Sequence, residues 1–401
     1  MSTALFVGFP AHGHTNPSLP LVQALVARGQ RVIYYSSRAF EPAITGAGAS
    51  FRAYESPWMD TLVAGMTDVQ RLSWLLTRTT ADVLERDFAS AQAERPDYVV
   101  SDSVAMWGQW MAARLGVPCA HSVPTFAFSR KVMSYAARHG VRPTSVRLAW
   151  TKISHVARAV WLAKQLKRRY GAGPTFLSAM LGQAPLNIVH TSAYFQPCAE
   201  TFDDRYQFVG PTLEARRESP DFPWDRVPAG PLVYVSLGTL FNADVSFYRA
   251  CFDAFRSEPF SVVMSIGRRI SSAELGTPPP NVLVFESVPQ MAVLARAQAF
   301  VTHGGMNSAT EGLFHGVPLV VVPQMGEQAL VAGRVEELGA GVTLVPHAVT
   351  ADRLREAVRR VLHEPGLREG VQRIRESFAN GGGAGRGADA VIAYAARQSA
   401  V

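Results

Sequence analysis

Two histidines lie close together near the start of the chain, in the segment PAHGHTNP at residues 10–17. Three interpretations compete for His12 and His14: metal ligands, polar residues that only begin a helix, or a general base beside a binding cleft. A metal is disfavoured, because no nearby Cys, Asp or further His completes a ligand set. A dinucleotide turn is disfavoured too, since the Gly-x-Gly-x-x-Gly pattern is missing. Capping and base catalysis both stay open.

An acid follows another apolar run. Asp102 comes directly after Tyr98–Ser101, at a point where a strand would give way to a helix. Aspartate is among the residues favoured as a helix N-cap, which is one explanation. The other is a carboxylate that orients a histidine and stabilises its protonated ring. The residues alone favour neither the helix cap nor the histidine partner.

The densest polar constellation lies in residues 286–328. A strand is expected to end at Thr302, and the next six residues, His303–Ser308, would open a helix. Glycines there let backbone N–H groups approach a phosphate, whose charge the helix dipole favours. Glu311, one turn beyond Asn307, could accept hydrogen bonds from two vicinal hydroxyls such as those of a ribose. Together these residues predict a site for a phosphate-bearing nucleotide.

The composition excludes several classes of protein. The 401 residues suggest two or three domains, and 48% apolar against 18% charged residues excludes a disordered chain. Apart from one dense stretch at Lys164–Arg169, the positive charge behind the net charge of +7 is spread along the sequence, so no nucleic-acid partner is indicated. Three distant cysteines suit neither a zinc site nor a disulfide scaffold. With no signal peptide and no uninterrupted apolar span, we expect a soluble cytoplasmic protein.

Strand and helix patterns alternate along the chain. The apolar run Ala4–Phe9 predicts a buried strand, residues 19–26 have helical spacing, and Arg31–Ser36 returns to a strand pattern. The alternation recurs as the strand Tyr98–Ser101, the helix Val104–Leu115 and the strand Val117–Ala120. Such alternation predicts an α/β fold with a parallel sheet.

Changes in amino-acid composition divide the chain into four parts. We expect an N-terminal domain at residues 1–210, a proline-punctuated linker at 211–231, and a second α/β domain at 232–380. Residues 381–401 would form a glycine hinge and a short helix, Ala388–Arg397. The glycines of Asn380–Gly387 are not expected to bind phosphate, since no strand precedes them.

Residues 286–328 closely resemble the nucleotide-sugar signature of glycosyltransferase family 1, the UDP-glycosyltransferase superfamily, and most closely its bacterial macrolide-type members. The resemblance extends to residues 10–17, to Asp102, to the turn Val235–Thr239 and to the order of the domains. It implies the GT-B fold, in which two Rossmann-like domains face each other across a cleft. The acceptor would bind the N-terminal domain and the donor the C-terminal one, with a final helix crossing back.

The resemblance also assigns roles to residues. His14 would be the general base, Asp102 its partner, and His12 only a neighbour. The implied donor site comprises Ser236, Thr239, His303, Gly305, Asn307 and Ser308 at the diphosphate, Glu311 at the ribose, Val288 and Gln290 at the base, and Glu327 and Gln328 at the sugar. The sequence departs from the family twice: plant members carry tryptophan in place of Val288, and many members carry aspartate in place of Glu327. The reaction would be inverting, with a UDP-sugar as co-substrate and neither cofactor nor metal.

The acceptor side is less sharply marked. Large apolar side chains gather near the predicted loops of the first domain, and the candidates for an acceptor pocket are Trp58, Met59, Trp74, Met106, Phe126 and Met133. Such a pocket would suit a macrolide, a flavonoid or another phenol. Residues 146–170 read as a basic amphipathic helix, with Ile153, Val156, Val160 and Leu166 on one side. We expect it to be a pocket wall with a solvated cationic end, although such a helix can also lie on a membrane.

Three functions follow from these patterns. The first is metal-independent transfer of a sugar, most simply glucose, to a small apolar acceptor. The second is a peripheral membrane enzyme with a lipid acceptor, and the third is a catalytically silent protein that binds sugar nucleotides. The third is hard to reconcile with the presence of both His14 and Asp102. We expect small-molecule partners, with neither nucleic acid nor a membrane among them.

Overall fold

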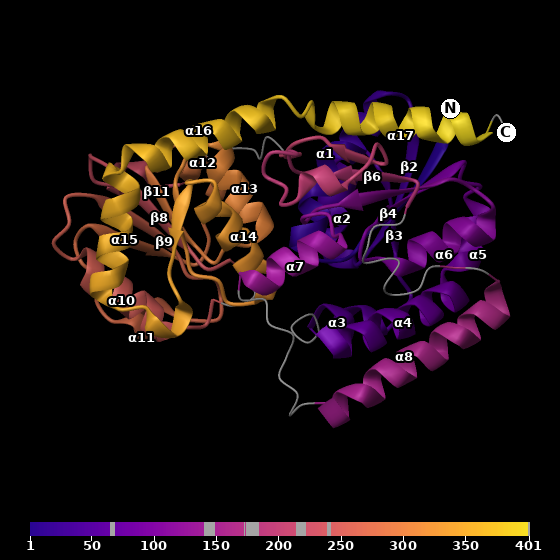
Figure 1. Ribbon diagram of the computed structural model, residues 1–401, viewed down its shortest axis with the longest axis horizontal. Helices are drawn as coiled ribbons and strands as arrows, with labels where there is room; N and C mark the ends of the chain where they lie inside the picture. The colour runs from indigo at the N-terminus through magenta and orange to yellow at the C-terminus, as the bar shows by residue number, and fades with distance from the viewer. Residues whose placement is uncertain are drawn as a thin grey trace. The chain divides into compact units, whose positions relative to one another are not determined.

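The computed structural model describes residues 1–64, 69–139, 149–171, 173, 184–213, 222–238 and 242–399. The chain divides into two compact units; in Figure 1 the N-terminal unit runs from indigo to magenta and also includes the yellow helix at the end of the chain. The N-terminal unit comprises Met1–Ser134, Arg142–Glu214 and Ala379–Val401. The C-terminal unit comprises Tyr135–Val141 and Ala215–Phe378. The end of the chain therefore groups with the N-terminal unit.

A parallel sheet forms the centre of the N-terminal unit, with the strand order β3-β2-β1-β4-β5-β6-β7. Its strands are β1 (Thr3–Val7), β2 (Arg31–Ser36), β3 (Ser50–Ala53), β4 (Tyr98–Asp102), β5 (Cys119–Val123), β6 (Leu186–Val189) and β7 (Tyr206–Phe208). Both faces of the sheet are covered by helices, which explains why its central strands are continuous apolar runs. Leu5 and Val7 contribute to one core, and Ala4 and Phe6 to the other.

The helices of this unit lie on two sides of the sheet (Figure 1). The core that contains Phe6 is completed by α1 (His12–Ala27), α2 (Glu41–Gly46) and α17 (Gly383–Ser399). The core that contains Leu5 is completed by α3 (Trp58–Ala64), α4 (Val69–Arg86), α5 (Phe88–Ala93), α6 (Met106–Leu115) and α8 (Ala149–Tyr170). A further helix, α7 (Arg130–Arg138), follows β5.

The C-terminal unit repeats this architecture. Its parallel sheet has the order β10-β9-β8-β11-β12-β13. The strands are β8 (Leu232–Ser236), β9 (Ser261–Ser265), β10 (Val282–Phe285), β11 (Ala299–Thr302), β12 (Leu319–Val321) and β13 (Gly341–Thr343). The helices are α10 (Val245–Phe255), α11 (Ser272–Leu275), α12 (Gln290–Leu294), α13 (Met306–Phe314), α14 (Gly326–Glu337), α15 (Ala351–His363) and α16 (Pro365–Ala379). One core packs α10 and α15 against the sheet.

The expected alternation of strands and helices is confirmed in both units, but three strands of the N-terminal sheet were not anticipated. β3, β6 and β7 are short, and polar residues interrupt them. The final helix is longer than the expected Ala388–Arg397, because α17 already begins at Gly383 and continues to Ser399. A Cβ atom at Gly387 would lie 3.2 Å from Ile188 and 3.3 Å from Leu21, so this glycine lets α17 approach the core closely.

Within the part of the chain that the structure describes, no helix has the length and apolar character needed to cross a membrane.

Candidate active site

His14 lies in the first turn of α1, whereas the sequence showed helical spacing only at residues 19–26. α1 begins at His12, directly after Ala11, and it contains Pro17 and Pro20. Proline usually interrupts a helix, but the buried face of this one is held by the hydroxyl groups of Ser18 and Tyr34, 2.8 Å apart. Tertiary contacts thus outweigh the two missing N–H groups.

The helical conformation separates the two histidines. Residues two positions apart on a helix point in roughly opposite directions, at about 200°. His12 is exposed and its ring contacts Phe40, with centroids 4.9 Å apart. His14 is 8% exposed and lies against Phe9 at 4.9 Å. Only His14 is directed into the protein.

Asp102 is the partner of His14. The imidazole Nδ1 lies 2.9 Å from Asp102 Oδ2, and the carboxylate is only 2% exposed. The other oxygen, Oδ1, accepts a hydrogen bond of 2.8 Å from the backbone N–H of Val104. Both oxygens are therefore engaged, which fixes the orientation of the carboxylate. A carboxylate that accepts from Nδ1–H makes Nε2 the basic nitrogen of the neutral ring.

The alternative interpretation of Asp102 as a helix cap is wrong. Asp102 is the last residue of β4, and α6 begins four residues later at Met106. The N-cap of α6 is Ala105, which makes no side-chain capping bond. The bond to Val104 instead closes a local turn between the strand and the helix.

A second buried histidine lies at the same edge of the sheet, and sequence reasoning missed it. His190 follows β6; its Nε2 lies 2.7 Å from Ser122 Oγ, and its Nδ1 lies 2.7 Å from Thr212 Oγ1. The Thr212 hydroxyl donates its proton to the carbonyl of Pro17 in α1. Thr212 must therefore accept from Nδ1–H, and Ser122 must donate to Nε2. The available signal was a histidine at the start of the polar run His190–Ser192, which directly follows the strand.

Burial keeps the neighbouring histidines neutral. It lowers the pKa of His190 to about 4 and that of His121 to about 4, although the negative charge of Asp102 opposes both shifts. His121 bonds to Gln109 through Nε2. Neither ring carries a positive charge at neutral pH, so neither competes with His14 for the carboxylate of Asp102.

The residues expected to bind the acceptor follow the carboxyl ends of β3, β4 and β5, but they differ in exposure. Met59 and Met106 are 4% exposed and belong to the hydrophobic core, with Trp58 and Trp74 at its margin. Phe126 is buried against Phe195, with centroids 5.3 Å apart. Met133 on α7 is 48% exposed.

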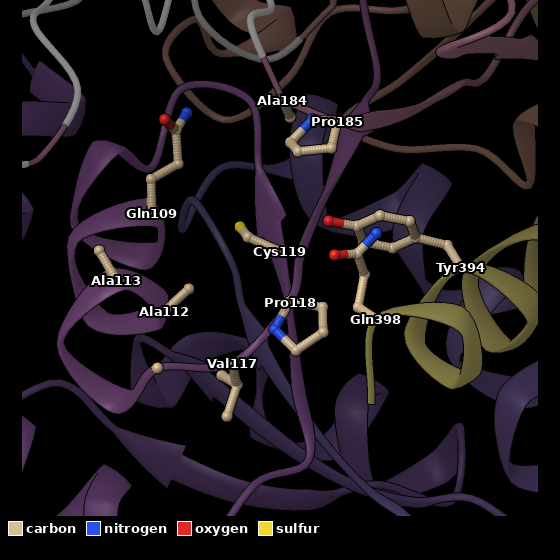
Figure 2. A pocket seen from close by; sticks show the side chains of 11 residues that line it. Gln109, Ala112, Ala113, Val117, Pro118, Cys119, Ala184, Pro185, Tyr394 and Gln398 are labelled. Carbon is tan, nitrogen blue, oxygen red and sulfur yellow. The ribbon is translucent and has the colours of Figure 1, made fainter. Parts of the chain in front are cut away.

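A cavity of about 560 Å³ lies at the opposite edge of this sheet, at the amino ends of β5 and β6 (Figure 2). Cys119, Pro185 and Tyr394 are among the residues that line it. Burial raises the pKa of the Cys119 thiol to about 12, so it stays protonated. None of the expected acceptor residues lines this cavity, which is separate from the histidine and aspartate pair.

In the C-terminal unit, the expected donor residues follow the carboxyl ends of four strands. Ser236 ends β8, Val288 follows β10, His303 follows β11, and Glu327 with Gln328 follow β12. Because β8, β11 and β12 are consecutive in the parallel sheet, their ends share one edge. Thr239 lies outside the described residues.

His303 occupies a space that two glycines leave open. A Cβ atom on Gly238 would lie 2.5 Å from the ring, and one on Gly305 would collide with Nε2. Gly238 also has a φ of +76°, which favours glycine. The Nδ1 atom is buried and has no partner among the described residues. Burial lowers the pKa of His303 to about 4, so the ring is neutral.

The helix start beside His303 offers backbone donors. α13 begins at Met306 with Gly305 as its N-cap, and neither a capping side chain nor an acid occupies its first turn. Asn307 and Ser308 are both partly exposed there. This arrangement is suited to an anion, because free N–H groups and the helix dipole both favour negative charge.

Glu311 and Gln290 are joined directly. The amide Nε2 of Gln290 donates to Glu311 Oε2 at 2.5 Å, and its Oε1 accepts from Tyr234 at 3.0 Å. Glu311 is 4% exposed. The sequence had paired Gln290 with the nucleobase, whereas in the structure its amide connects Tyr234 to the carboxylate of Glu311.

Glu327 and Gln328 both lie in the first turn of α14 but point differently. Glu327 is exposed, whereas Gln328 is 6% exposed and accepts a hydrogen bond of 2.7 Å from the backbone N–H of Gln324.

Among the described residues, no group of three or more His, Cys, Asp or Glu side chains is arranged to hold a metal ion.

The chain is similar to known glycosyltransferases in sequence and in fold. Residues 259–382 match the family model of the C-terminal domain of erythromycin biosynthesis protein CIII-like proteins. The chain is 34% identical over 397 residues to the NDP-glycosyltransferase YjiC of Bacillus licheniformis, covering 96% of each chain. It is 32% identical to the oleandomycin glycosyltransferase of Streptomyces antibioticus, covering 96% of this chain and 88% of that one. The crystal structure of the calicheamicin glycosyltransferase CalG4 superposes with a TM-score of 0.83 at 33% identity, covering 99% of each chain.

Proposed function

This chain belongs to the bacterial macrolide-type members of glycosyltransferase family 1, with the GT-B fold, and from that premise we propose that it transfers glucose from a UDP-sugar to a hydroxyl of a small apolar acceptor. The acceptor we propose is a macrolide, a flavonoid or another phenol. The three relatives compared above are all named as glycosyltransferases. The oleandomycin and calicheamicin relatives support a natural product as the acceptor.

The observation that carries the proposal is the contact of 2.9 Å between His14 Nδ1 and Asp102 Oδ2. Nε2 of His14 takes the proton of the acceptor hydroxyl, and the carboxylate of Asp102 stabilises the imidazolium that forms. The activated oxygen then forms a bond to the anomeric carbon. The bond from that carbon to the diphosphate breaks, and the nucleoside diphosphate leaves with the electron pair. Attack opposite the leaving group inverts the anomeric configuration.

Hydrogen-bond donors at fixed positions would stabilise the negative charge that develops on the leaving diphosphate. The N–H groups at the start of α13 and the neutral ring of His303 are available for this role. Preorganised donors of this kind stabilise developing negative charge effectively. We therefore propose that the reaction needs no metal ion.

A single assay tests the proposal. The purified chain is incubated with one phenol and, in parallel, with UDP-glucose, UDP-galactose, UDP-N-acetylglucosamine and TDP-glucose, each with and without EDTA. We expect the highest turnover with UDP-glucose, no effect of EDTA, and a β-linked product from the α-linked donor by NMR. An α-linked product, or activity abolished by EDTA, would contradict the mechanism. Turnover of an aliphatic alcohol by a His14→Ala control at the parent's rate would contradict the role of the base.

A further inference from the structure

The helix α8 carries an unusual concentration of positive charge. Its sequence, AWTKISHVARAVWLAKQLKRRY, holds six lysines and arginines and no acidic residue. Three of the four lysines of the chain, Lys152, Lys164 and Lys167, lie in it. With a net charge of +7 for all 401 residues, the surplus of positive charge in this one helix nearly equals that of the whole chain.

Three large apolar side chains on α8 are exposed. Val156 is 44% exposed, Val160 is 50% exposed, and Trp161 is 61% exposed. Leu166, expected on the same side as the valines, is 5% exposed and belongs to the core beneath the helix. A solvated helix would be expected to keep large apolar groups inside, so this outward set needs a partner.

The outward apolar and cationic side chains form one continuous face. We define the α8 face as Val156, Val160, Trp161, Lys164, Lys167 and Arg168, all of which are exposed. At 3.6 residues per turn they span about 140° of the helix circumference, and at 1.5 Å per residue they extend over about 18 Å. The opposite side of the helix packs on α4, beside which α8 lies in Figure 1.

The cations of this face are available for an external partner. Arg169, at the margin of the face, is 3.7 Å from Glu85. Among the described residues, by contrast, no acid forms an ion pair with Lys164, Lys167 or Arg168. Their long aliphatic stems can lie along an apolar surface while the charged ends stay hydrated.

We propose that the α8 face docks the protein onto an anionic lipid surface. A single convex helix has no groove to receive a protein segment, but it suits a flat and yielding bilayer. Exposed tryptophan is the side chain favoured at the headgroup level, and lysine and arginine are attracted by anionic headgroups. Because no described helix can cross a membrane, α8 would lie in the interface plane and remain reversible in its binding.

Vesicle co-sedimentation tests the proposal. The full-length protein is mixed with vesicles of phosphatidylcholine alone or with 30% phosphatidylglycerol. Each cation near such a surface contributes about fivefold to partitioning, so we expect the triple variant K164E/K167E/R168E to bind the anionic vesicles at least about a hundredfold more weakly. Trp161→Ser should weaken binding by about tenfold. Raised salt should reduce binding of the parent, and neutral vesicles should not bind it.

A matched variant separates the face from the net charge. R373E/R375E/R397E makes the same change in charge at three exposed arginines elsewhere, and it should retain most of the binding. All variants should keep the parent's melting temperature and its turnover of a water-soluble phenol. Failure of the parent to bind anionic vesicles, or equal losses in the two triple variants, would overturn the proposal. So would a parent dimer that the α8 variants convert to monomers, since the face would then join two copies of this chain.

Discussion

Each of the two units has its own parallel sheet with helices on both faces, yet the carboxyl edges of the two sheets carry different functional groups. In the N-terminal unit, the edge carries buried side chains that bond to one another, with His14 on Asp102 and His190 between Ser122 and Thr212. In the C-terminal unit, the edge carries an uncapped helix start and a histidine lodged between two glycines.

The difference shows how one architecture can support two kinds of chemistry. Proton transfer needs a side chain whose protonation state is controlled, and a buried charged partner provides that control. Binding of a diphosphate needs several donors at fixed positions, which backbone N–H groups provide once small residues make room. Variants in the N-terminal unit should therefore alter the rate of proton transfer, and variants in the C-terminal unit should alter nucleotide affinity.

The largest effect is expected for Asp102→Asn. An asparagine can keep the bond to the N–H of Val104 but would offer its NH₂ group to His14 Nδ1, which places the ring proton on the wrong nitrogen. Turnover of an aliphatic alcohol at saturating donor should fall by about 10²- to 10⁴-fold, whereas an acidic phenol should suffer less.

The control for Asp102→Asn is UDP affinity measured by calorimetry, which should not change. An Asp102→Asn enzyme as active as the parent would contradict the proposal that the N-terminal unit provides proton transfer and the C-terminal unit binds the nucleotide.

The pH dependence of stability is the next largest effect. The pKa of His121 and of His190 is about 4 in the folded protein and 6.5 when unfolded. Between these values the unfolded chain binds protons that the folded chain does not, so the free energy of unfolding falls as the pH falls from 6.5 to 4. At pH 5 each histidine lowers the free energy of unfolding by about 2 kcal/mol relative to pH 7.

One carboxyl group in the N-terminal unit opposes this trend. Burial raises the pKa of Asp87 to about 6, so its protonation adds about 1 kcal/mol of stability at pH 5. The net loss expected from these three groups is about 2 kcal/mol, and urea unfolding at pH 7 and pH 5 measures it together with the loss from His303. His190→Gln should remove about 2 kcal/mol of the difference. An unchanged difference in that variant would mean that His190 does not titrate as described.

Glu311→Ala tests the donor edge. It removes a buried carboxylate and leaves the amide of Gln290 without its partner, so UDP should bind about 1–3 kcal/mol more weakly by calorimetry. The exposed Glu356→Ala serves as the control and should bind as the parent does. Affinity unchanged by Glu311→Ala would remove Glu311 from the nucleotide site.

The smallest effect is expected for Gly238→Ala. The added methyl group would lie 2.5 Å from His303 and displace its ring, lowering UDP affinity by about tenfold. Gly339→Ala is the matched control: Gly339 also has positive φ, but the nearest atom to its Cβ position is 4.0 Å away. Both variants carry the strain of a positive φ, and only Gly238→Ala should lose affinity. Equal affinities would show that the space around His303 is not needed for binding.

The sequence by itself determined the alternation of strands and helices and the family to which the chain belongs. These features depend on local patterns, such as the apolar run Ala4–Phe9 and the polar cluster His303–Ser308, which adjacent residues specify without help from distant ones. The strands that escaped notice, β3, β6 and β7, are short and partly polar, and they form because neighbouring strands provide the pairing.

Only the tertiary structure decided how those residues are used. It placed His14 in a helix despite two prolines, because buried contacts of α1 outweigh the missing backbone bonds. It placed Asp102 beside a histidine 88 positions away and not at the start of the following helix, a choice that the residues alone left open and the family resemblance implied. It turned Val156 and Val160 of α8 outward and Leu166 inward, since the side of a helix that is buried depends on what packs against it. Contacts between residues distant in sequence carry no local signature, and so the pattern alone could not reveal them.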